Sequence, residues 1–383
     1  MKILVASDSY KGSLSTFEVI EAVKEAVKRV GINIEVLGIP IADGGEGTVE
    51  VVLQALKGKK IHCKATDPLG RPITAYFGLI EHTAIVEMAV ASGLTKLSHI
   101  ERNPLDTTTY GTGEVIRAAL DHPEVKKLII AIGGSATNDG GVGLAQALGL
   151  RALDEKGNEI QLGGRHIDKI AKLDTCNMHP RLKKVQIQVI CDVINPLCGP
   201  NGASAVYGPQ KGATPEMVEQ LDKNLLHLAR ILEKDLGKDV LNLPGAGAAG
   251  GTGAGLVAFC GATLEPGIEV ILDLFQIDEH LKDVELVITG EGRTDFQTEF
   301  GKAVIGIAKR AKRFGKTVVC VSGALGEGYQ ELYQHGIDAF FSICPRPINE
   351  QESMVRAYSY LVDTLENIIR LYAKNWFITT KCG

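Results

Sequence analysis

Five short segments of the chain carry acidic side chains, four of them together with glycine, and two of the five also carry a lysine or an arginine. Backbone N–H groups in glycine-rich loops and cationic side chains bind phosphate oxygens, whereas carboxylates bind Mg²⁺ or orient an attacking hydroxyl. These residue types together favour phosphoryl transfer. Each segment closely follows an apolar run rich in β-branched residues; the five cover residues 7–13, 42–48, 133–141, 191–196 and 290–302.

A purely structural role is open for any one of these segments. Glycine after a strand often serves turn geometry, and aspartate in that place often caps a helix. Five such segments with so many acids favour a ligand site over turns alone. The chain holds 44 glycines among 383 residues, and they cluster in loops, where the backbone can approach a bound molecule closely.

Two familiar nucleotide-binding motifs can be tested directly. No glycine stands five residues before any Gly-Lys pair, which excludes a standard Walker A loop. Residues 245–250 match GxGxxG, but they follow 241–244, which is a poor strand. Gly247 and Gly250 therefore stay open to three roles: a phosphate-contacting loop before a helix, tight backbone packing, or a dinucleotide-binding fingerprint.

The apolar runs predict the strands that would position these segments. The first two runs flank a helical pattern that starts with a capping box at Ser15 and Glu18, so the chain opens as a βαβ unit of a parallel sheet. Residues 59–88 instead predict antiparallel hairpins. We expect strands at 2–6, 34–39, 59–65, 73–80, 84–88, 127–132, 185–190, 284–289, 317–321 and 338–343, and helices at 16–30, 46–56, 112–121, 141–149, 216–236, 252–261, 302–313 and 351–373.

These elements predict an α/β protein with two domains, since the chain is too long for one ordinary core. A discontinuous parallel-sheet domain, Rossmann-like or flavodoxin-like, is expected from residues 1–58 and 265–383. A mixed α/β domain, residues 59–264, is inserted in it, and the strand at 127–132 fits either side. Ligands of open parallel sheets bind beyond the carboxyl ends of the strands, so we expect the active-site cleft between the two domains.

Composition excludes several classes of protein. The net charge is −5 with a pI near 6.0, which argues against a nucleic-acid or anionic-membrane surface. The eight cysteines are scattered without a CxxC pair, as expected for free thiols in a reducing compartment. No apolar stretch approaches the roughly 18 residues of a membrane span, and the N-terminus lacks a signal peptide. We expect a cytoplasmic protein and leave a homo-oligomer open.

The chain resembles the bacterial glycerate kinase family of the type-1 class. The resemblance is collinear over nearly the whole chain and rests on unusual strings: 8–13, 42–48, 133–141, 191–197, 208–213 and 290–302. Ser7, Tyr10 and Thr294 depart from the usual family residues Pro, Phe and Leu without removing a charge or a glycine. The resemblance implies D-glycerate and ATP as substrates, Mg²⁺ dependence, and 2-phosphoglycerate more often than 3-phosphoglycerate as product.

Roles for the charged residues follow as hypotheses. Lys11 is assigned to a phosphate oxygen or the glycerate carboxylate, and Arg293 is the better carboxylate clamp because its planar fork binds bidentately. Lys302 would pair with the transferring phosphate. Asp192 and Asp295 share Mg²⁺ binding and orientation of the substrate hydroxyl, without a division of these two tasks.

Further residues are assigned to nucleotide binding. Gly133, Gly134 and Ser135 would offer N–H groups to ATP, and Gly247 and Gly250 belong to the GxGxxG loop. Lys211 serves either a substrate or only a turn. The second-tier acids are Asp8, Asp43 and Glu46.

Two other functions remain open. A nicotinamide-dependent oxidoreductase of a 2-hydroxy acid would use the GxGxxG segment together with an acid about 20 residues further on, where Glu269 stands in a segment that reads as helical. A non-enzymatic small-anion-binding protein would not need so many carboxylates, which repel phosphate.

Overall fold

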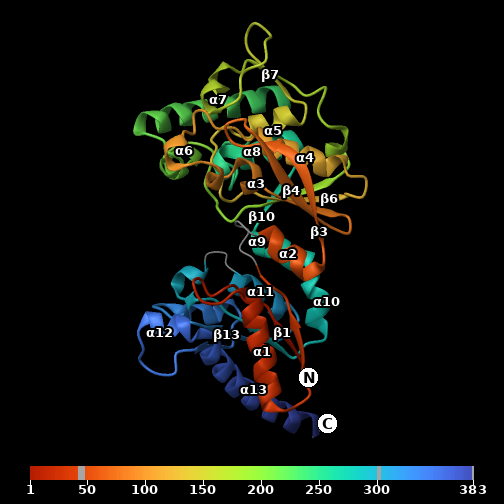
Figure 1. The fold of residues 1–383 in the computed structure, drawn as a ribbon, viewed down its shortest axis with the longest axis vertical. Coiled ribbons are helices and arrows are strands. Elements are labelled where there is room, and N and C mark those ends of the chain that lie inside the picture. Colours follow the sequence, from red (N-terminus) through yellow and green to blue (C-terminus); the bar gives the residue numbers. More distant parts are fainter. Residues whose placement is uncertain (42–47, 300–302, 382–383) are drawn as a thin grey trace. The chain divides into compact units, whose positions relative to one another are not determined.

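The computed structural model describes residues 1–41, 48–299 and 303–381, with side chains as far as Lys374. The chain forms two compact units. The first unit consists of Met1–Asp43 and Ile268–Gly383, and the second unit of Gly44–Gly267 (Figure 1). The sequence patterns predicted these divisions after residues 58 and 264 instead.

The first unit is built on a five-stranded sheet in which every strand pair is parallel. The spatial order β15-β13-β11-β1-β2 corresponds to 5-4-3-1-2 in chain order, which is the flavodoxin-like arrangement. The sheet strands are β1 (Lys2–Val5), β2 (Glu35–Gly38), β11 (Leu286–Thr289), β13 (Thr317–Ser322) and β15 (Ala339–Ser342), with β12 (Arg293–Thr294) paired to β14 (Ala324–Leu325). The helices are α1 (Thr16–Val30), α9 (Gly267–Leu274), α10 (Ile277–Lys282), α11 (Ala303–Arg313), α12 (Glu350–Val355) and α13 (Ala357–Lys381).

Local sequence explains the opening helix of this unit. The Ser15 hydroxyl accepts the Glu18 N–H, and the Glu18 carboxylate accepts the Ser15 N–H, so the predicted capping box forms. Gly31 ends α1 with φ 74°, in the left-handed region where glycine is favoured. The buried face of α1, including Val19 and Val23, packs into the core with the sheet.

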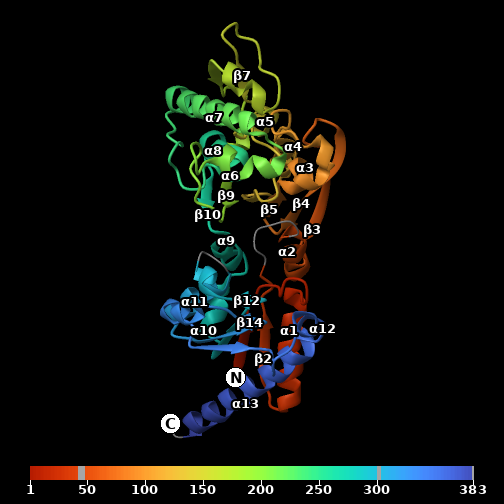
Figure 2. The same cartoon turned by 90° about the vertical axis from the view of Figure 1, so that its left-hand side faces the viewer.

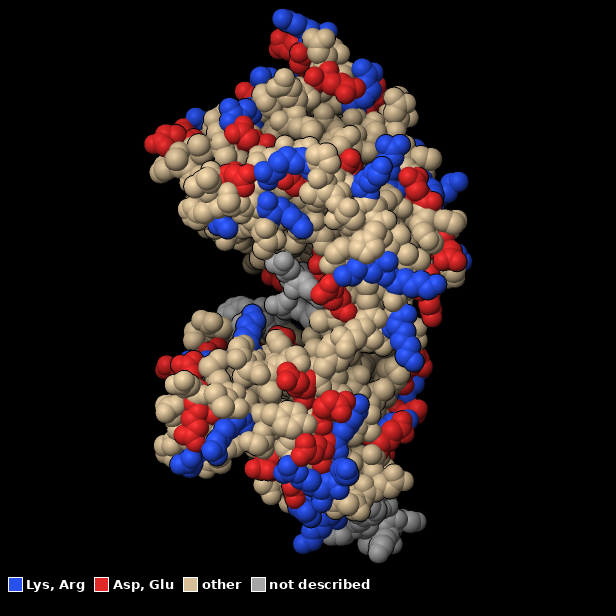
Figure 3. All heavy atoms as spheres, in the orientation of Figure 1, with Lys and Arg blue, Asp and Glu red and all other residues tan. Residues whose placement is uncertain are grey.

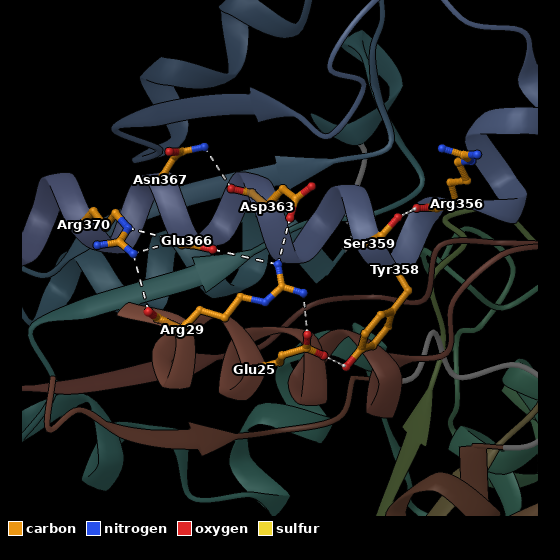
Figure 4. A network of polar contacts seen from close by, with 9 residues as sticks. All are labelled: Glu25, Arg29, Arg356, Tyr358, Ser359, Asp363, Glu366, Asn367 and Arg370. Carbon is orange, nitrogen blue, oxygen red and sulfur yellow. Dashed lines mark hydrogen bonds and ion pairs between the residues drawn. The ribbon is translucent and has the colours of Figure 1, made fainter. Parts of the chain in front are cut away.

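Helices α1 and α13 lie side by side on one face of this sheet (Figures 1 and 2). A polar network on their outer edge joins them (Figure 4). The Arg29 guanidinium contacts Glu25 on its own helix at 2.6 Å and Asp363 on α13 at 2.9 Å, and the Tyr358 hydroxyl donates to Glu25 at 3.1 Å. These contacts are exposed and contribute little to stability, so the buried apolar residues supply most of the stability of the helix pair.

The second unit is built on a six-stranded mixed sheet of order β10-β9-β6-β5-β4-β3. Strands β5, β6, β9 and β10 are parallel, and β3-β4-β5 form the predicted antiparallel hairpins. The strands are β3 (Lys59–Thr66), β4 (Pro72–Ile80), β5 (Thr83–Glu87), β6 (Lys127–Ala131), β9 (Gln186–Ile190) and β10 (Thr263–Glu265), with a separate pair β7 (Arg151–Leu153) and β8 (Lys172–Asp174). The helices are α2 (Thr48–Leu56), α3 (Ala89–Ser92), α4 (Tyr110–Asp121), α5 (Val142–Ala147), α6 (Ala203–Tyr207), α7 (Pro215–Leu236) and α8 (Ala248–Cys260).

Two of the expected elements are placed or divided differently in the structure. Helix α2, expected with the first domain, packs on β4 in the second unit, because Val49 and Leu53 lie against the bare backbone of Gly78. The single helix expected at 351–373 is two helices, with Arg356 between them at φ −101° and ψ 8°. Strand β6, which fitted either domain in sequence, belongs to the second unit.

The charge distribution on the surface and the hydropathy of the helices can be compared with the expectations from composition. On the face shown in Figure 3, acidic and basic side chains are interspersed over both units. None of the helices that the structure describes is long and apolar enough to span a membrane. The cytoplasmic location stays a prediction.

Candidate active site

The first unit has a topological switch point between β1 and β11, where the strand order reverses. Open α/β sheets bind ligands at this point, beyond the carboxyl ends of the strands. The segments after these two strands are 7–13 and 290–295, and they are joined directly: the Ser7 hydroxyl donates to the Gly290 carbonyl at 2.8 Å, and the Asp8 N–H donates to it at 3.0 Å. The fold therefore brings two of the five predicted segments together.

Lys11 lies at the tip of a tight turn in the first segment. Tyr10 and Leu14 close this turn through backbone hydrogen bonds in both directions, and Gly12 within it has φ 81°. The buried Tyr10 hydroxyl donates to the Val321 carbonyl at 2.5 Å, which anchors the turn to β13. Burial raises the pKa of Tyr10 well above its ordinary value, so this phenol remains a hydrogen-bond donor. The exposed Lys11 is thus presented by a fixed backbone.

Arg293 and Asp295 form an ion pair in the second segment. The Arg293 Nε lies 3.2 Å from Asp295 Oδ2, and the Asp295 Oδ1 accepts the Gln297 N–H at 3.0 Å. Arg293 is largely exposed, with 68% of its side chain accessible, whereas Asp295 is 17% accessible. A side chain at Gly292 would contact the Lys11 backbone, so Lys11, Arg293 and Asp295 belong to neighbouring stretches of chain.

Glu291 is an acid of this loop to which the sequence analysis gave no role. It directly follows Gly290, and its Oε1 accepts hydrogen bonds from the Thr298 hydroxyl at 2.7 Å and the Thr294 hydroxyl at 3.1 Å. The Thr294 hydroxyl also lies 2.7 Å from the Ser322 hydroxyl on β13. The signal that could have found Glu291 is its place between two glycines at the end of a buried strand. Thr294, where the family usually has leucine, helps to hold this carboxylate.

In the second unit, the loop after β6 presents unused backbone donors. Gly133 and Gly134 are exposed, and neither N–H donates a hydrogen bond within the described chain. Gly134 has φ 71°, a conformation in which glycine is favoured. The next residue, Ser135, is buried. Successive free N–H groups in such a turn are suited to bind an anion.

Lys211 is buried directly behind this loop, with 2% of its surface exposed. Its ammonium donates to the Ser135 hydroxyl at 2.8 Å and to the Thr137 carbonyl at 2.7 Å. Burial lowers the pKa of Lys211 to about 7, against the opposing effect of the negative charge of Asp139. Burial also raises the pKa of Asp139, while hydrogen bonds from Thr109 and the Gly141 N–H act in the other direction.

Asp192 lies exposed just after β9. Its Oδ1 accepts the N–H of Gly267, the first residue of α9, at 2.7 Å. A side chain at Gly267 would approach Asp192 Oδ2 to 2.9 Å. The structural role that the sequence left open for such aspartates, capping of a helix, is therefore fulfilled by Asp192, and its second oxygen faces the same helix start.

The GxGxxG segment starts α8 and is packed against backbone. Gly247 and Gly250 are both buried; an added Cβ would lie 2.2 Å from the Pro196 carbonyl oxygen at Gly247 and 2.0 Å from the Thr137 carbonyl oxygen at Gly250. Tight packing, one of the three open roles, explains both glycines. A dinucleotide fingerprint needs a preceding strand, and the residues between β9 and α8 contain none.

The remaining candidate residues are Glu269, Lys302, Asp43 and Glu46. Glu269, the acid required by the oxidoreductase reading, lies on α9 and pairs with Arg310 at 2.9 Å. Lys302, Asp43 and Glu46 lie outside the described residues. No group of three or more His, Cys, Asp or Glu side chains that could hold a metal ion occurs among the residues that the structure describes.

Comparison with known proteins decides the family. The sequence model of the Glycerate kinase family matches residues 3–373. The chain belongs to the glycerate kinase family. The glycerate kinase of Halalkalibacterium halodurans is 48% identical over 368 residues, covering 96% of this chain and 97% of that protein. The glycerate 2-kinase of Escherichia coli K12 is 46% identical over 370 residues, covering 96% of this chain and 97% of that protein.

A solved structure agrees with this family assignment. The crystal structure of a putative glycerate kinase 2 from Salmonella typhimurium LT2 superposes with a TM-score of 0.87 at 46% identity, covering 98% of this chain and 99% of that one. The predicted α/β fold and the recognition from the motifs are confirmed. Members of this family are glycerate kinases, so the chain is a phosphotransferase, as predicted. The kinase family implies ATP as the co-substrate, and the oxidoreductase and anion-binding alternatives lose their support.

Proposed function

We propose that this enzyme transfers the γ-phosphate of ATP to the 2-hydroxyl of D-glycerate in a reaction that requires Mg²⁺. The observation that carries the proposal is the union of segments 7–13 and 290–295 at the switch point of the first unit, where cations and carboxylates meet glycine backbone. The printed name of the Escherichia coli relative, glycerate 2-kinase, supports the 2-hydroxyl.

The first unit supplies the groups suited to glycerate. Arg293 would clamp the glycerate carboxylate with its planar guanidinium, and the Asp295 pair would hold that guanidinium in one orientation. Lys11 would neutralise a second anionic oxygen. Glu291, fixed by two threonine hydroxyls, is suited to accept the proton of the attacking hydroxyl. Lys302 remains proposed for the transferring phosphate.

The second unit supplies the groups suited to the nucleotide. The unused N–H groups of Gly133 and Gly134 would bind phosphate oxygens of ATP, and Ser135 would fix the loop. Tight packing makes a direct phosphate contact by Gly247 or Gly250 unnecessary. The cleft between the domains stays a prediction, as does a homo-oligomer.

Mg²⁺ fits the carboxylates that are present. Kinases usually hold this ion through one or two carboxylates together with substrate phosphates and water, so a three-residue protein cluster is not required. Asp192 and Asp295, each at the end of a parallel strand, are the proposed ligands. The bound ion would neutralise charge that develops on the transferred phosphoryl group.

Phosphorus NMR of the product tests the proposal in one run. Incubation of the enzyme with ATP, MgCl₂ and D-glycerate should give 2-phosphoglycerate and ADP, and EDTA should stop the reaction. L-glycerate and lactate serve as matched controls for stereochemistry and for the second hydroxyl. Formation of 3-phosphoglycerate would refute the regiochemistry, and turnover in excess EDTA would refute the role of the metal.

A further inference from the structure

A buried lysine, whose ammonium contacts no carboxylate among the described residues, lies behind the candidate nucleotide loop. The Lys211 ammonium makes its two hydrogen bonds to Ser135 and Thr137, both in the loop after β6. Lys211 itself is held by a short 3-10 turn, Pro209–Lys211, which ends at Gly212 with φ 90°. The backbone of Gly212 packs against the Arg102 carbonyl, where an added Cβ would lie at 2.3 Å. The Lys211 side chain therefore connects this fixed turn to the loop after β6.

The other side of the loop is anchored by Asp139. This buried carboxylate accepts the Thr109 N–H at 2.8 Å, the Thr109 hydroxyl at 2.9 Å and the Gly141 N–H at 3.1 Å. Asp139 thus fixes the end of the loop, whereas Lys211 fixes its start, next to the free N–H groups of Gly133 and Gly134. Removal of Lys211 would leave the Ser135 hydroxyl and the Thr137 carbonyl without their donor.

Holding a loop through a buried ammonium is unfavourable in free energy, because the charge is removed from water. Burial of a charge costs several kcal/mol more than burial of an apolar chain of the same size, so packing alone would favour methionine at this position. A positive charge just behind free N–H groups does, however, attract an anion that binds in front of them. Only 2% of the Lys211 surface is exposed, so its ammonium acts on that anion from behind the loop and not by direct contact.

We propose that Lys211 is a positioning residue, which in its protonated form holds the loop 133–137 ready for the phosphates of ATP and adds attraction from behind the loop. The inference rests on the proposed nucleotide site and deepens it. It predicts that nucleotide binding is coupled to proton uptake by an amine that does not touch the nucleotide.

The pH range of this coupling follows from the burial of Lys211. Burial brings the pKa of its ammonium down to about 7, and Asp139 is the charged group that acts on it among the described residues. The phosphates of ATP add negative charge nearby and so raise this pKa on binding. Because only the protonated form prepares the loop, the apparent affinity falls with the protonated fraction. The dissociation constant therefore rises about sixteenfold from pH 7 to pH 8.5.

The first test uses the unaltered enzyme. Titration calorimetry with the non-hydrolysable ATP analogue adenylyl imidodiphosphate and MgCl₂ at pH 7.5 is run in HEPES and in Tris, whose ionisation enthalpies differ. We expect a difference in apparent enthalpy that corresponds to net proton uptake by the enzyme. Equal enthalpies in the two buffers would overturn the coupling.

The second test compares Lys211→Met with a matched control, Arg181→Met. Arg181 also donates to backbone carbonyls of the same unit (Leu120, His122 and Val125), but it does so near the opposite end of β6. Lys211→Met should raise KM for ATP at least tenfold at pH 7 and flatten its pH dependence, with KM for D-glycerate unchanged. Arg181→Met should lower Tm and leave both KM values and the pH dependence as they are.

The outcomes separate this inference from the proposed function. When the unaltered enzyme binds the analogue but Lys211→Met binds it equally well with the same pH dependence, the positioning role is wrong and the kinase proposal stands. When the unaltered enzyme fails to bind the analogue, both are wrong. If the Lys211→Met protein does not fold, Ser135→Ala is measured instead, because it removes one of the two hydrogen-bond acceptors of Lys211. An unchanged KM for ATP in Ser135→Ala would contradict the positioning role of Lys211.

Discussion

A methyl group added at Gly250 would collide with the candidate nucleotide loop. The built Cβ of Gly250→Ala lies 2.0 Å from the Thr137 carbonyl oxygen and 2.7 Å from the Asn138 Cα. The Gly250 carbonyl also accepts the Gly140 N–H at 3.0 Å, so the two backbones cannot separate without loss of this hydrogen bond. All these atoms belong to the backbone, so relief of the collision requires the loop 137–140 to move.

The expected cost has two parts. Gly250 has φ 70°, and a non-glycine residue in this left-handed region costs about 1 kcal/mol. Overpacking against a rigid neighbour adds about 2 kcal/mol. Gly237→Ala is the matched control, because Gly237 has φ 65° in the same unit and nothing lies within 4 Å of its built Cβ. At about 2–4 °C per kcal/mol, we expect Tm to fall by about 6–12 °C for Gly250→Ala and about 2–4 °C for Gly237→Ala.

Thermal unfolding followed by circular dichroism measures both variants, and a kinetic assay gives KM for ATP. Gly250→Ala should raise KM for ATP because the displaced backbone carries Thr137, an acceptor of Lys211. Gly237→Ala should leave that KM unchanged. Equal losses of Tm in the two variants would refute the contact between the two glycine-rich segments, and an unchanged KM in Gly250→Ala would refute its link to nucleotide binding.

Three further substitutions, the last with a matched control, test individual side chains. Asp192→Asn keeps an oxygen that accepts the Gly267 N–H, so Tm should hardly change while kcat falls on the order of a hundredfold; near-normal kcat would leave Asp192 only as a cap of α9. Arg293→Lys should raise KM for glycerate more than KM for ATP, and an equal rise in both would count against the carboxylate clamp. Arg310 is buried among Glu269, Asp273 and Asp278, so Arg310→Met should lower the free energy of unfolding by about 3 kcal/mol in urea titration. The control is Arg370→Met, which removes an exposed ion pair with Glu366 and should lower the free energy of unfolding by less than about 1 kcal/mol. Similar losses for Arg310→Met and Arg370→Met would contradict the argument from burial.

Local patterns were sufficient for most of the elements. Residues 127–132 and 317–321 read as strands because buried β-branched runs depend on short-range periodicity, and β6 and β13 confirm them. The capping box at Ser15 depends on residues three apart and was equally readable. Helix α2 was assigned to the wrong side of the division, because its partner Gly78 is distant in sequence and carries no side chain that a pattern could show.

The candidate site was predictable as a set of segments and not as a set of contacts. Glycine and acid after a strand indicate a ligand site because the carboxyl ends of parallel strands meet at one edge. The pairing of Arg293 with Asp295 and the support of Glu291 by Thr298 depend on how the loop turns. The sequence could not distinguish between a substrate contact and a turn as the role of Lys211, because the burial of this side chain cannot be seen in the sequence.

Residue types and short spacings along the chain were enough to predict the family, the enzyme class and the alternation of strand, loop and helix. Which glycines pack against neighbouring backbone, and which present unused N–H groups, became known only from the tertiary structure. The tertiary structure also decided that the Lys211 ammonium lies behind a loop. Burial and partner geometry arise from residues far apart in the chain, such as Ser135 and Lys211, and only folding brings them within hydrogen-bond distance.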